Sequence, residues 1–195
     1  LIKTAPILDI SAGLAELHSV KAIHIVAVNN EVKELLWILQ KEYKGTVSLT
    51  AANITKDEEN VFTVPYKDID EATYALPKKY LYEPNAAIMK SGAFDAVAHH
   101  YGIAKLHRHT HLYTSHELIP FDGRSFTIEN IIPYQKTEMK TLEGKKMNIT
   151  VRNFPLSVEE IRKKWKLKDG GDTYCFFTTN NKGEKIVLVC TKAIL

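Results

Sequence analysis

The chain has 195 residues, of which 45% are apolar and 25% are charged, and its formal net charge is +3. This composition is typical of a soluble globular protein and excludes a disordered or fibrous one. Because no stretch approaches the roughly 18 apolar residues of a membrane span and no signal peptide opens the chain, we expect a cytoplasmic protein without a membrane partner. Two cysteines, Cys175 and Cys190, are too few for a disulfide framework and predict free thiols.

The chain begins with Leu1, inside an apolar run that continues to Leu8. We therefore interpret it as a C-terminal fragment and expect the missing N-terminal part of the same protein to be a partner. An apolar sheet edge would then be open at residues 1–7 or 23–28, and open edges pair with other chains. This interpretation predicts self-association.

The first 64 residues are predicted to alternate strands and helices. Residues 23–28 are almost continuously apolar and β-branched, which is typical of a strand buried on both faces of a parallel sheet. Apolar residues at helical spacing then predict a helix from Val32 to Tyr43 that ends at Gly45. Further strands are predicted at 47–52 and 61–64.

The resulting βαβαβ pattern has fewer strands than the roughly five or six of a doubly wound sheet, so it predicts the closing part of a larger α/β domain. The charge changes at the same place, because residues 1–64 have a net charge of −2 and residues 65–195 have +5. We therefore predict a domain boundary near Pro65.

Residues 65–195 are predicted to form a second domain of α+β type. The helix expected at 158–167 has the strongest signals, because Ser157 and Glu160 form a capping box. Its cationic side chains are expected to face solvent; they are Arg162, Lys163, Lys164, Lys166 and Lys168. The other expected elements are a helix at 86–101, strands at 105–114, 124–132 and 147–154, and a hairpin with arms at 173–178 and 185–191.

Histidines crowd between positions 99 and 116, and His107, His109 and His111 would share one face of a strand. A His-x-His pair can bind zinc, but the spacing supplies no further ligand, so the sequence favours a half-exposed polar strand face and no metal. Cys175 and Cys190 are expected to share one hairpin face as packing residues. The sequence has no nucleophile elbow, phosphate-binding loop or dinucleotide fingerprint, so it predicts no catalytic residue.

Basic residues concentrate between positions 136 and 168, where there are ten Lys or Arg and four Asp or Glu. Such a patch can neutralise phosphates, which gives salt-dependent binding of nucleic acid. A lysine-rich outer face is also a common way for a helix to stay solvated, and the overall charge is mild, so both interpretations stay open. The predicted nucleic-acid contacts are Lys90, Arg108, Arg124, Arg152, Lys163 and Lys164.

Two groups of segments resemble known protein domains. Residues 1–10, 23–28 and 30–36 look like the end of a class I S-adenosylmethionine (SAM)-dependent methyltransferase domain. The second group resembles the THUMP-like domain that follows it in bacterial proteins of this kind, and comprises residues 82–92, 105–115, 153–155 and 168–172. The resemblance implies an α/β fold, the incomplete end of a Rossmann-like methyltransferase domain, followed by an α+β THUMP-like domain.

THUMP domains proper bind RNA, so the resemblance implies a SAM-dependent methyltransferase with RNA as its partner. In the family, the glycine-rich SAM loop, the acidic residue that binds the ribose and the catalytic Asp-Pro or Asn-Pro loop lie upstream of the strand that opens this chain. We therefore assign no catalytic or cofactor-binding residue, and expect SAM to bind the intact protein and not this fragment. Two alternatives stay open: a noncatalytic nucleic-acid-binding module, and a structural or protein-interaction domain.

Overall fold

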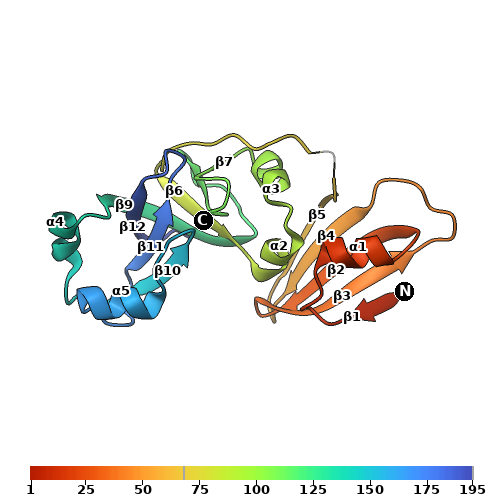
Figure 1. Cartoon of the computed structure of the whole chain (residues 1–195), viewed down its shortest axis with the longest axis horizontal. Coiled ribbons are helices and arrows are strands. Elements are labelled where there is room, and N and C mark those ends of the chain that lie inside the picture. Colours follow the sequence, from red (N-terminus) through yellow and green to blue (C-terminus); the bar gives the residue numbers. More distant parts are fainter. Residues whose placement is uncertain (68, 195) are drawn as a thin grey trace. The chain divides into compact units, whose positions relative to one another are not determined.

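The computed structural model describes residues 1–67 and 69–194, which form two compact units (Figure 1). The first unit comprises Leu1–Ala72 and Pro84–His100, and the second comprises Thr73–Glu83 and Tyr101–Leu195. The units interleave along the sequence, whereas the boundary predicted near Pro65 assumes two consecutive segments. In the described part of the chain, no helix is long and apolar enough to span a membrane.

The first unit contains a five-stranded mixed sheet with the strand order β1-β3-β2-β4-β5. β1 and β2 both pair antiparallel with β3, β2 pairs parallel with β4, and β4 pairs antiparallel with β5. The strands predicted at 23–28, 47–52 and 61–64 are confirmed as β2, β4 and β5. The elements are β1 (Ile2–Thr4), α1 (Ile10–Glu16), β2 (Val20–Val28), β3 (Glu31–Leu39), β4 (Ser48–Ile54), β5 (Glu59–Pro65), α2 (Ala86–Ser91) and α3 (Phe94–Tyr101).

The helix predicted from Val32 to Tyr43 is wrong, because this segment forms strand β3 and pairs with β2. Asn29 and Asn30 connect the two strands with backbone φ angles of 50° and 62°. Positive φ at both central residues is what a two-residue hairpin turn of type I′ requires, and asparagine tolerates it better than most residues. The βαβαβ pattern is therefore corrected to one helix, α1, and five strands.

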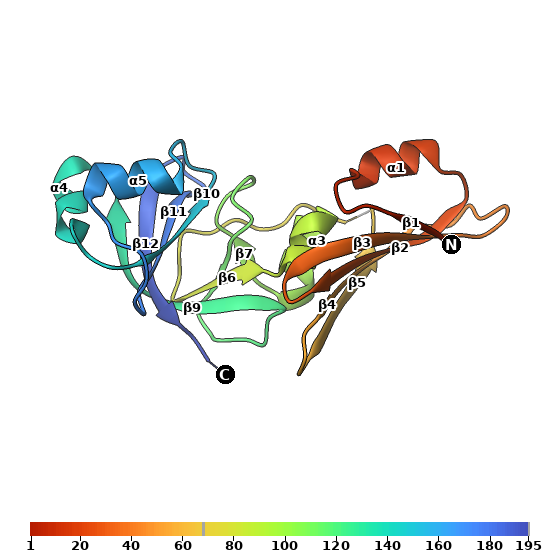
Figure 2. The same cartoon turned by 90° about the horizontal axis from the view of Figure 1, so that it is seen from below.

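Side chains on one face of this sheet form its core. Ile23, Ile25 and Trp37 are fully buried, whereas the residues between them on β2 and β3 are half-buried. The helices lie on this one side of the sheet (Figure 2), and a Cβ atom at Gly13 of α1 would come within 2.4 Å of the Trp37 ring. The prediction that residues 23–28 are buried on both faces is therefore wrong. β2 also lies in the middle of the sheet, so of the two segments expected at an open edge only β1 lies at an edge.

The helix predicted at 86–101 is divided into α2 and α3. Gly92 separates them with a φ of 70°, the left-handed conformation in which α2 ends. Asn85 begins α2, because its side-chain oxygen accepts a hydrogen bond of 3.0 Å from the Ile88 N–H. α2 then packs against β2, β3 and β4.

The second unit contains a seven-stranded sheet with the order β10-β11-β12-β9-β6-β8-β7. β10 pairs parallel with β11, whereas β12 pairs antiparallel with both β11 and β9. The strands predicted at 124–132 and 147–154 and the hairpin are confirmed. The elements are β6 (Tyr80–Pro84), β7 (Ala104–Lys105), β8 (Tyr113–Ser115), β9 (Gly123–Pro133), α4 (Lys136–Met139), η1 (Lys140–Leu142), β10 (Asn148–Arg152), α5 (Val158–Trp165), β11 (Tyr174–Thr179) and β12 (Lys185–Lys192).

Different clusters of apolar side chains bury the two faces of this sheet. The face beneath the helices, called the helix face, includes Met139, Leu142, Met147, Ile161, Trp165, Cys175, Phe177 and Val187. The opposite face includes Leu81, Leu106, Leu112, Phe126, Phe176, Leu188 and Cys190. It is called the arginine face because Arg124 and Arg152 lie on it. Helix α5 lies over β10 and β11 on the helix face (Figure 2).

Helix α5 confirms the helix predicted at 158–167 and its capping box. The Glu160 N–H donates to the Ser157 hydroxyl at 3.2 Å, and the Ser157 N–H donates to the Glu160 carboxylate at 2.7 Å. These two bonds satisfy N–H groups that the first helical turn leaves free. The helix ends at Lys166, which has a φ of 54°.

Cys175 and Cys190 lie on opposite faces of the hairpin, so the prediction that they share a face is wrong. Cys175 pairs with Val189, whereas Cys190 pairs with Tyr174. This register differs by one residue from the one counted from a turn at 181–182, and a one-residue shift moves a side chain to the other face. Both thiols are free and buried, and burial raises the pKa of Cys175 to about 12. Their expected role as packing residues is confirmed.

Candidate nucleic-acid interface

Two arginines on the arginine face share one buried carboxylate. Glu83 of β6 is 3% exposed, and its Oε2 accepts hydrogen bonds from Nε of Arg124, at 2.8 Å, and from Nη2 of the same side chain. The other oxygen, Oε1, accepts a bond of 2.7 Å from Nη2 of Arg152 at the end of β10. Arg124 and Arg152 were both predicted to contact nucleic acid, and the structure brings them together.

Aromatic and cationic side chains continue the arginine face beside this cluster. The Arg124 guanidinium carbon lies 5.5 Å from the centre of the Phe126 ring, and the Tyr174 ring centre lies 5.1 Å from that of Phe126. Lys192 Nζ lies 5.6 Å from the centre of the Tyr174 ring. Tyr174 is partly exposed and Lys192 is exposed. This row therefore offers a ring and two cations to a ligand.

Arg108 lies in the loop between β7 and β8, which corrects the strand predicted at 105–114. His107 Nδ1 accepts a hydrogen bond from the His109 N–H at 3.0 Å and lies 3.0 Å from the side-chain amide of Asn153. Burial, then the charges of His109 and Lys105, lower the pKa of His107, so it is neutral at pH 7. The loop is thereby attached next to Arg152, and Arg108 is exposed on it.

The three clustered histidines do not share a strand face as predicted. His107 and His109 lie in the loop, and His111 has a φ of 55°, which is incompatible with a regular strand. Among the described residues, no group of three or more His, Cys, Asp or Glu side chains is placed to hold a metal ion.

Lys163 and Lys164 lie on α5, which covers the helix face, so the structure separates them from Arg124 and Arg152. Lys163 and Lys164 are both exposed, and Lys164 Nζ lies 3.2 Å from the Tyr134 hydroxyl and 5.4 Å from the centre of the Trp165 ring. Arg162 was expected to face solvent, but its side chain is 23% exposed and pairs with Asp169. The basic stretch at 136–168 therefore does not form one continuous patch with the two paired arginines.

Lys90 belongs to the first unit, in the last turn of α2. It lines a pocket of about 280 Å³ together with Asp9, Ser11 and Lys67. Hydrogen bonds from Ser11 and from the Ala12 N–H lower the pKa of Asp9, and the charge of Lys90 adds to this effect. A carboxylate beside Lys90 weakens its attraction for phosphate.

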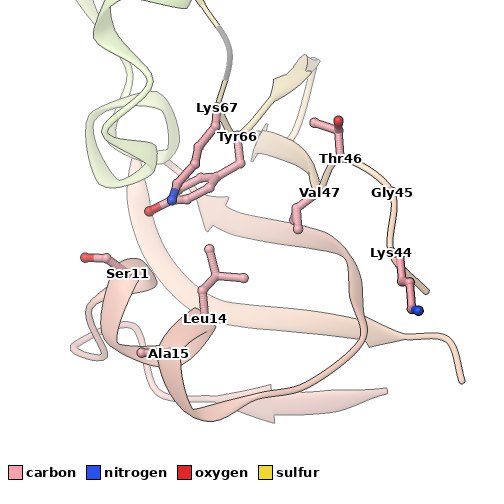
Figure 3. A pocket seen from close by; sticks show the side chains of 9 residues that line it. All are labelled: Ser11, Leu14, Ala15, Lys44, Gly45, Thr46, Val47, Tyr66 and Lys67. Atoms are coloured by element: carbon pink, nitrogen blue, oxygen red, sulfur yellow. The ribbon is translucent and has the colours of Figure 1, made fainter. Parts of the chain in front are cut away.

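A larger pocket of about 550 Å³ opens beside α1 in the same unit (Figure 3). Leu14 and Val47 provide apolar walls, and Lys67 Nζ lies 5.9 Å from the centre of the Tyr66 ring. The described lining residues also include Lys44 and no carboxylate. Such a pocket favours an anionic ligand with an apolar part.

Prediction from sequence missed three members of the arginine face: Glu83, Tyr174 and Lys192. Glu83 carried a usable signal, because it is a single acid within the apolar stretch of residues 81–84, and a buried charge requires a charged partner. Tyr174 and Lys192 carried no signal, because their proximity depends on the register of β11 with β12.

Parts of the chain are similar to known protein families, and nearly all of it is similar to a solved structure. Residues 80–121 match a family model described as a ferredoxin-like domain, and residues 123–192 match one described as THUMP domain-like. No curated protein matches the chain. A crystal structure from Porphyromonas gingivalis W83, described as a "putative methyltransferase", is 35% identical with a TM-score of 0.87.

That match covers 98% of this chain and 50% of the Porphyromonas chain, so this chain spans half the length of the solved structure. The two family matches, at residues 80–121 and 123–192, follow one another in the second part of this chain. The chain therefore combines mixed α/β sheets with a ferredoxin-like segment and a THUMP-like domain, and nearly all of it is similar to half of a protein described as a methyltransferase.

Proposed function

We propose that this chain is the RNA-binding part of a SAM-dependent methyltransferase. The arginine face is the observation that carries the proposal. Two fixed arginines and an exposed lysine can neutralise phosphates, and the partly exposed Tyr174 ring offers a surface on which a base can stack. The THUMP-like match of residues 123–192 supports RNA as the nucleic acid.

We propose that the first unit is the end of the Rossmann-like methyltransferase domain. β1 and β2 are both antiparallel to β3 and are therefore parallel to one another, and α1 connects them. A strand–helix–strand unit of this kind, with an antiparallel strand added, occurs in doubly wound sheets. Further strands can pair at the free edge of β1, which is also where we expect self-association of the isolated chain.

We propose that residues outside this chain hold SAM. The residues present do not fit the cofactor, because a nucleotide cradle needs glycines between a strand and the following helix. The loop between β1 and α1 holds Pro6 and no glycine. Calorimetry is expected to detect no binding of SAM to the 195-residue chain, and appreciable affinity would contradict this part of the proposal.

RNA binding is tested by fluorescence anisotropy with a labelled single-stranded RNA from low to moderate salt. We expect salt-dependent binding, and Lys192→Gln should reduce the slope of log affinity against log salt by about 0.7, the value for one phosphate contact on a single strand. Lys185→Gln is the matched control, because Lys185 begins the same strand and Val187, two residues on, faces the helices. Absence of salt-dependent binding would contradict the proposal and favour a protein-interaction domain.

A further inference from the structure

The ion pairs of Glu83 leave one positive charge uncompensated. A single carboxylate would be balanced by one arginine, yet it binds both Arg124 and Arg152. The cluster therefore has a formal charge of +1 around a carboxylate that is 3% exposed. Because water and salt screen the interactions of a buried carboxylate only weakly, Glu83 holds both guanidinium groups in fixed positions.

Both arginines keep donors that Glu83 does not use. The side chains of Arg124 and Arg152 are 46% and 35% exposed, and the bonds to Glu83 engage Nε and Nη2 of Arg124 but only Nη2 of Arg152. Nε of Arg152 is buried and has no hydrogen-bond partner in the described part of the chain. A buried N–H without a partner is costly, so Glu83 alone does not satisfy the hydrogen-bonding capacity of the Arg152 guanidinium.

We propose that Arg124 and Arg152, oriented by Glu83, form a site for one phosphate group of a nucleic-acid strand. The two guanidinium groups bind the two oxygens of one carboxylate, so they lie close enough for a single tetrahedral anion to contact both. A phosphodiester has two free oxygens, which suit two planar guanidinium donors. Glu83 is a positioning residue, because it acts through the arginines.

This inference rests on the proposed RNA binding for the identity of the anion. The neighbouring Tyr174 supports nucleic acid over a free anion, because its ring lies one aromatic side chain away from Arg124 and can take the base beside the bound phosphate. Inorganic phosphate has the same chemistry, so it serves as a second probe of the site.

Glu83→Gln is the decisive variant because it separates position from charge. It raises the net charge by one, so general electrostatic attraction would tighten RNA binding and steepen its salt dependence. A positioned site predicts the opposite, a loss of about tenfold in affinity at low salt, because the arginines lose their anchor. Glu117→Gln, at an exposed loop position in the same unit, makes the same charge change and is expected to tighten binding slightly.

Arg124→Lys and Arg152→Lys decide the matter if Glu83→Gln fails to fold. Each keeps the charge but removes the planar donor group, so we expect several-fold weaker RNA binding with thermal melting close to that of the original chain. Inorganic phosphate should shift the side-chain Nε–H resonance of Arg152 in a ¹⁵N-correlated spectrum. Tighter or unchanged RNA binding by Glu83→Gln, or unchanged binding by both lysine variants, would overturn the phosphate site.

The two probes distinguish this site from the proposed function. If phosphate shifts the Arg152 resonance but the chain binds no RNA, the anion site stands and the RNA function fails. If the chain binds RNA but Glu83→Gln binds it more tightly, the RNA function stands and the paired arginines are structural.

Discussion

The two faces of the second unit's sheet carry positive charge in different ways. On the helix face, α5 presents Lys163 on an exposed helix surface, and two further cations, Arg162 and Lys166, are paired with Asp169 and Glu143. On the arginine face, Arg124 and Arg152 are fixed by a buried carboxylate and keep unused donors. A stretch rich in basic residues in the sequence therefore does not by itself show where cations are held in fixed positions on the surface.

Removing the charged cluster should have the largest effect on RNA binding. The triple variant Glu83→Gln, Arg124→Gln and Arg152→Gln lowers the net charge by one and leaves no unpaired buried charge, which protects folding. We expect the affinity to fall about ten- to hundredfold at low salt and the salt slope to fall by about 0.7, the value for the one phosphate contact that the two arginines share. Anisotropy titrations measure both, and an unchanged slope would remove the arginine face from the interface.

Tyr174→Leu should have the next largest effect on the same face. Leucine keeps apolar bulk against Phe126 but cannot stack on a base, and stacking contributes roughly 1–3 kcal/mol per base. We expect about tenfold weaker RNA binding with an unchanged salt slope, because no charge is removed. If the variant changed the salt slope but bound RNA equally well at low salt, Tyr174 would act only through the neighbouring Lys192.

Ser157→Ala tests whether α5 is a structural cover of the helix face. Loss of the capping box should cost about 1 kcal/mol in the free energy of unfolding and lower the melting temperature by roughly 2–4 °C. RNA affinity, measured well below that temperature, is expected to stay the same. A fall in affinity would indicate that the start of α5 contributes to binding.

The smallest effect is expected from Lys163→Gln with Lys164→Gln. The prediction from sequence assigns both lysines to the interface, which would reduce the salt slope by about 1.4. These lysines lie on the other side of the sheet from the paired arginines, and salt screens exposed charges over distances beyond about 10 Å. We therefore expect the RNA affinity to change by no more than about twofold. A slope reduction as large as that of the triple variant would make the helix face the binding surface.

Sequence patterns predicted the elements whose signals are local. The capping box at Ser157 and the strand at 23–28 are confirmed, because each depends on residues close together in the chain. Asn29 and Asn30 gave an equally local signal for a hairpin, but apolar residues in the following strand also fit a helical period and outweighed it.

The candidate site was harder to predict because strand pairing assembles it. Arg152 stands next to the basic helix in sequence, yet it is on the arginine face, because side chains alternate along β10. Glu83 is 69 positions from Arg152, and no sequence period connects them. The one-residue register difference that separates the two cysteines has the same origin.

NMR on the ¹⁵N-labelled 195-residue chain tests most directly where RNA contacts the protein. A short single-stranded RNA is titrated, and backbone amides and arginine Nε–H groups are followed. We expect the largest shifts on the arginine face, at Arg124, Arg152, Tyr174 and Lys192, with the Arg152 Nε–H among them. Shifts confined to α5, Val158–Trp165, with none at Arg152 or Tyr174, would contradict this expectation.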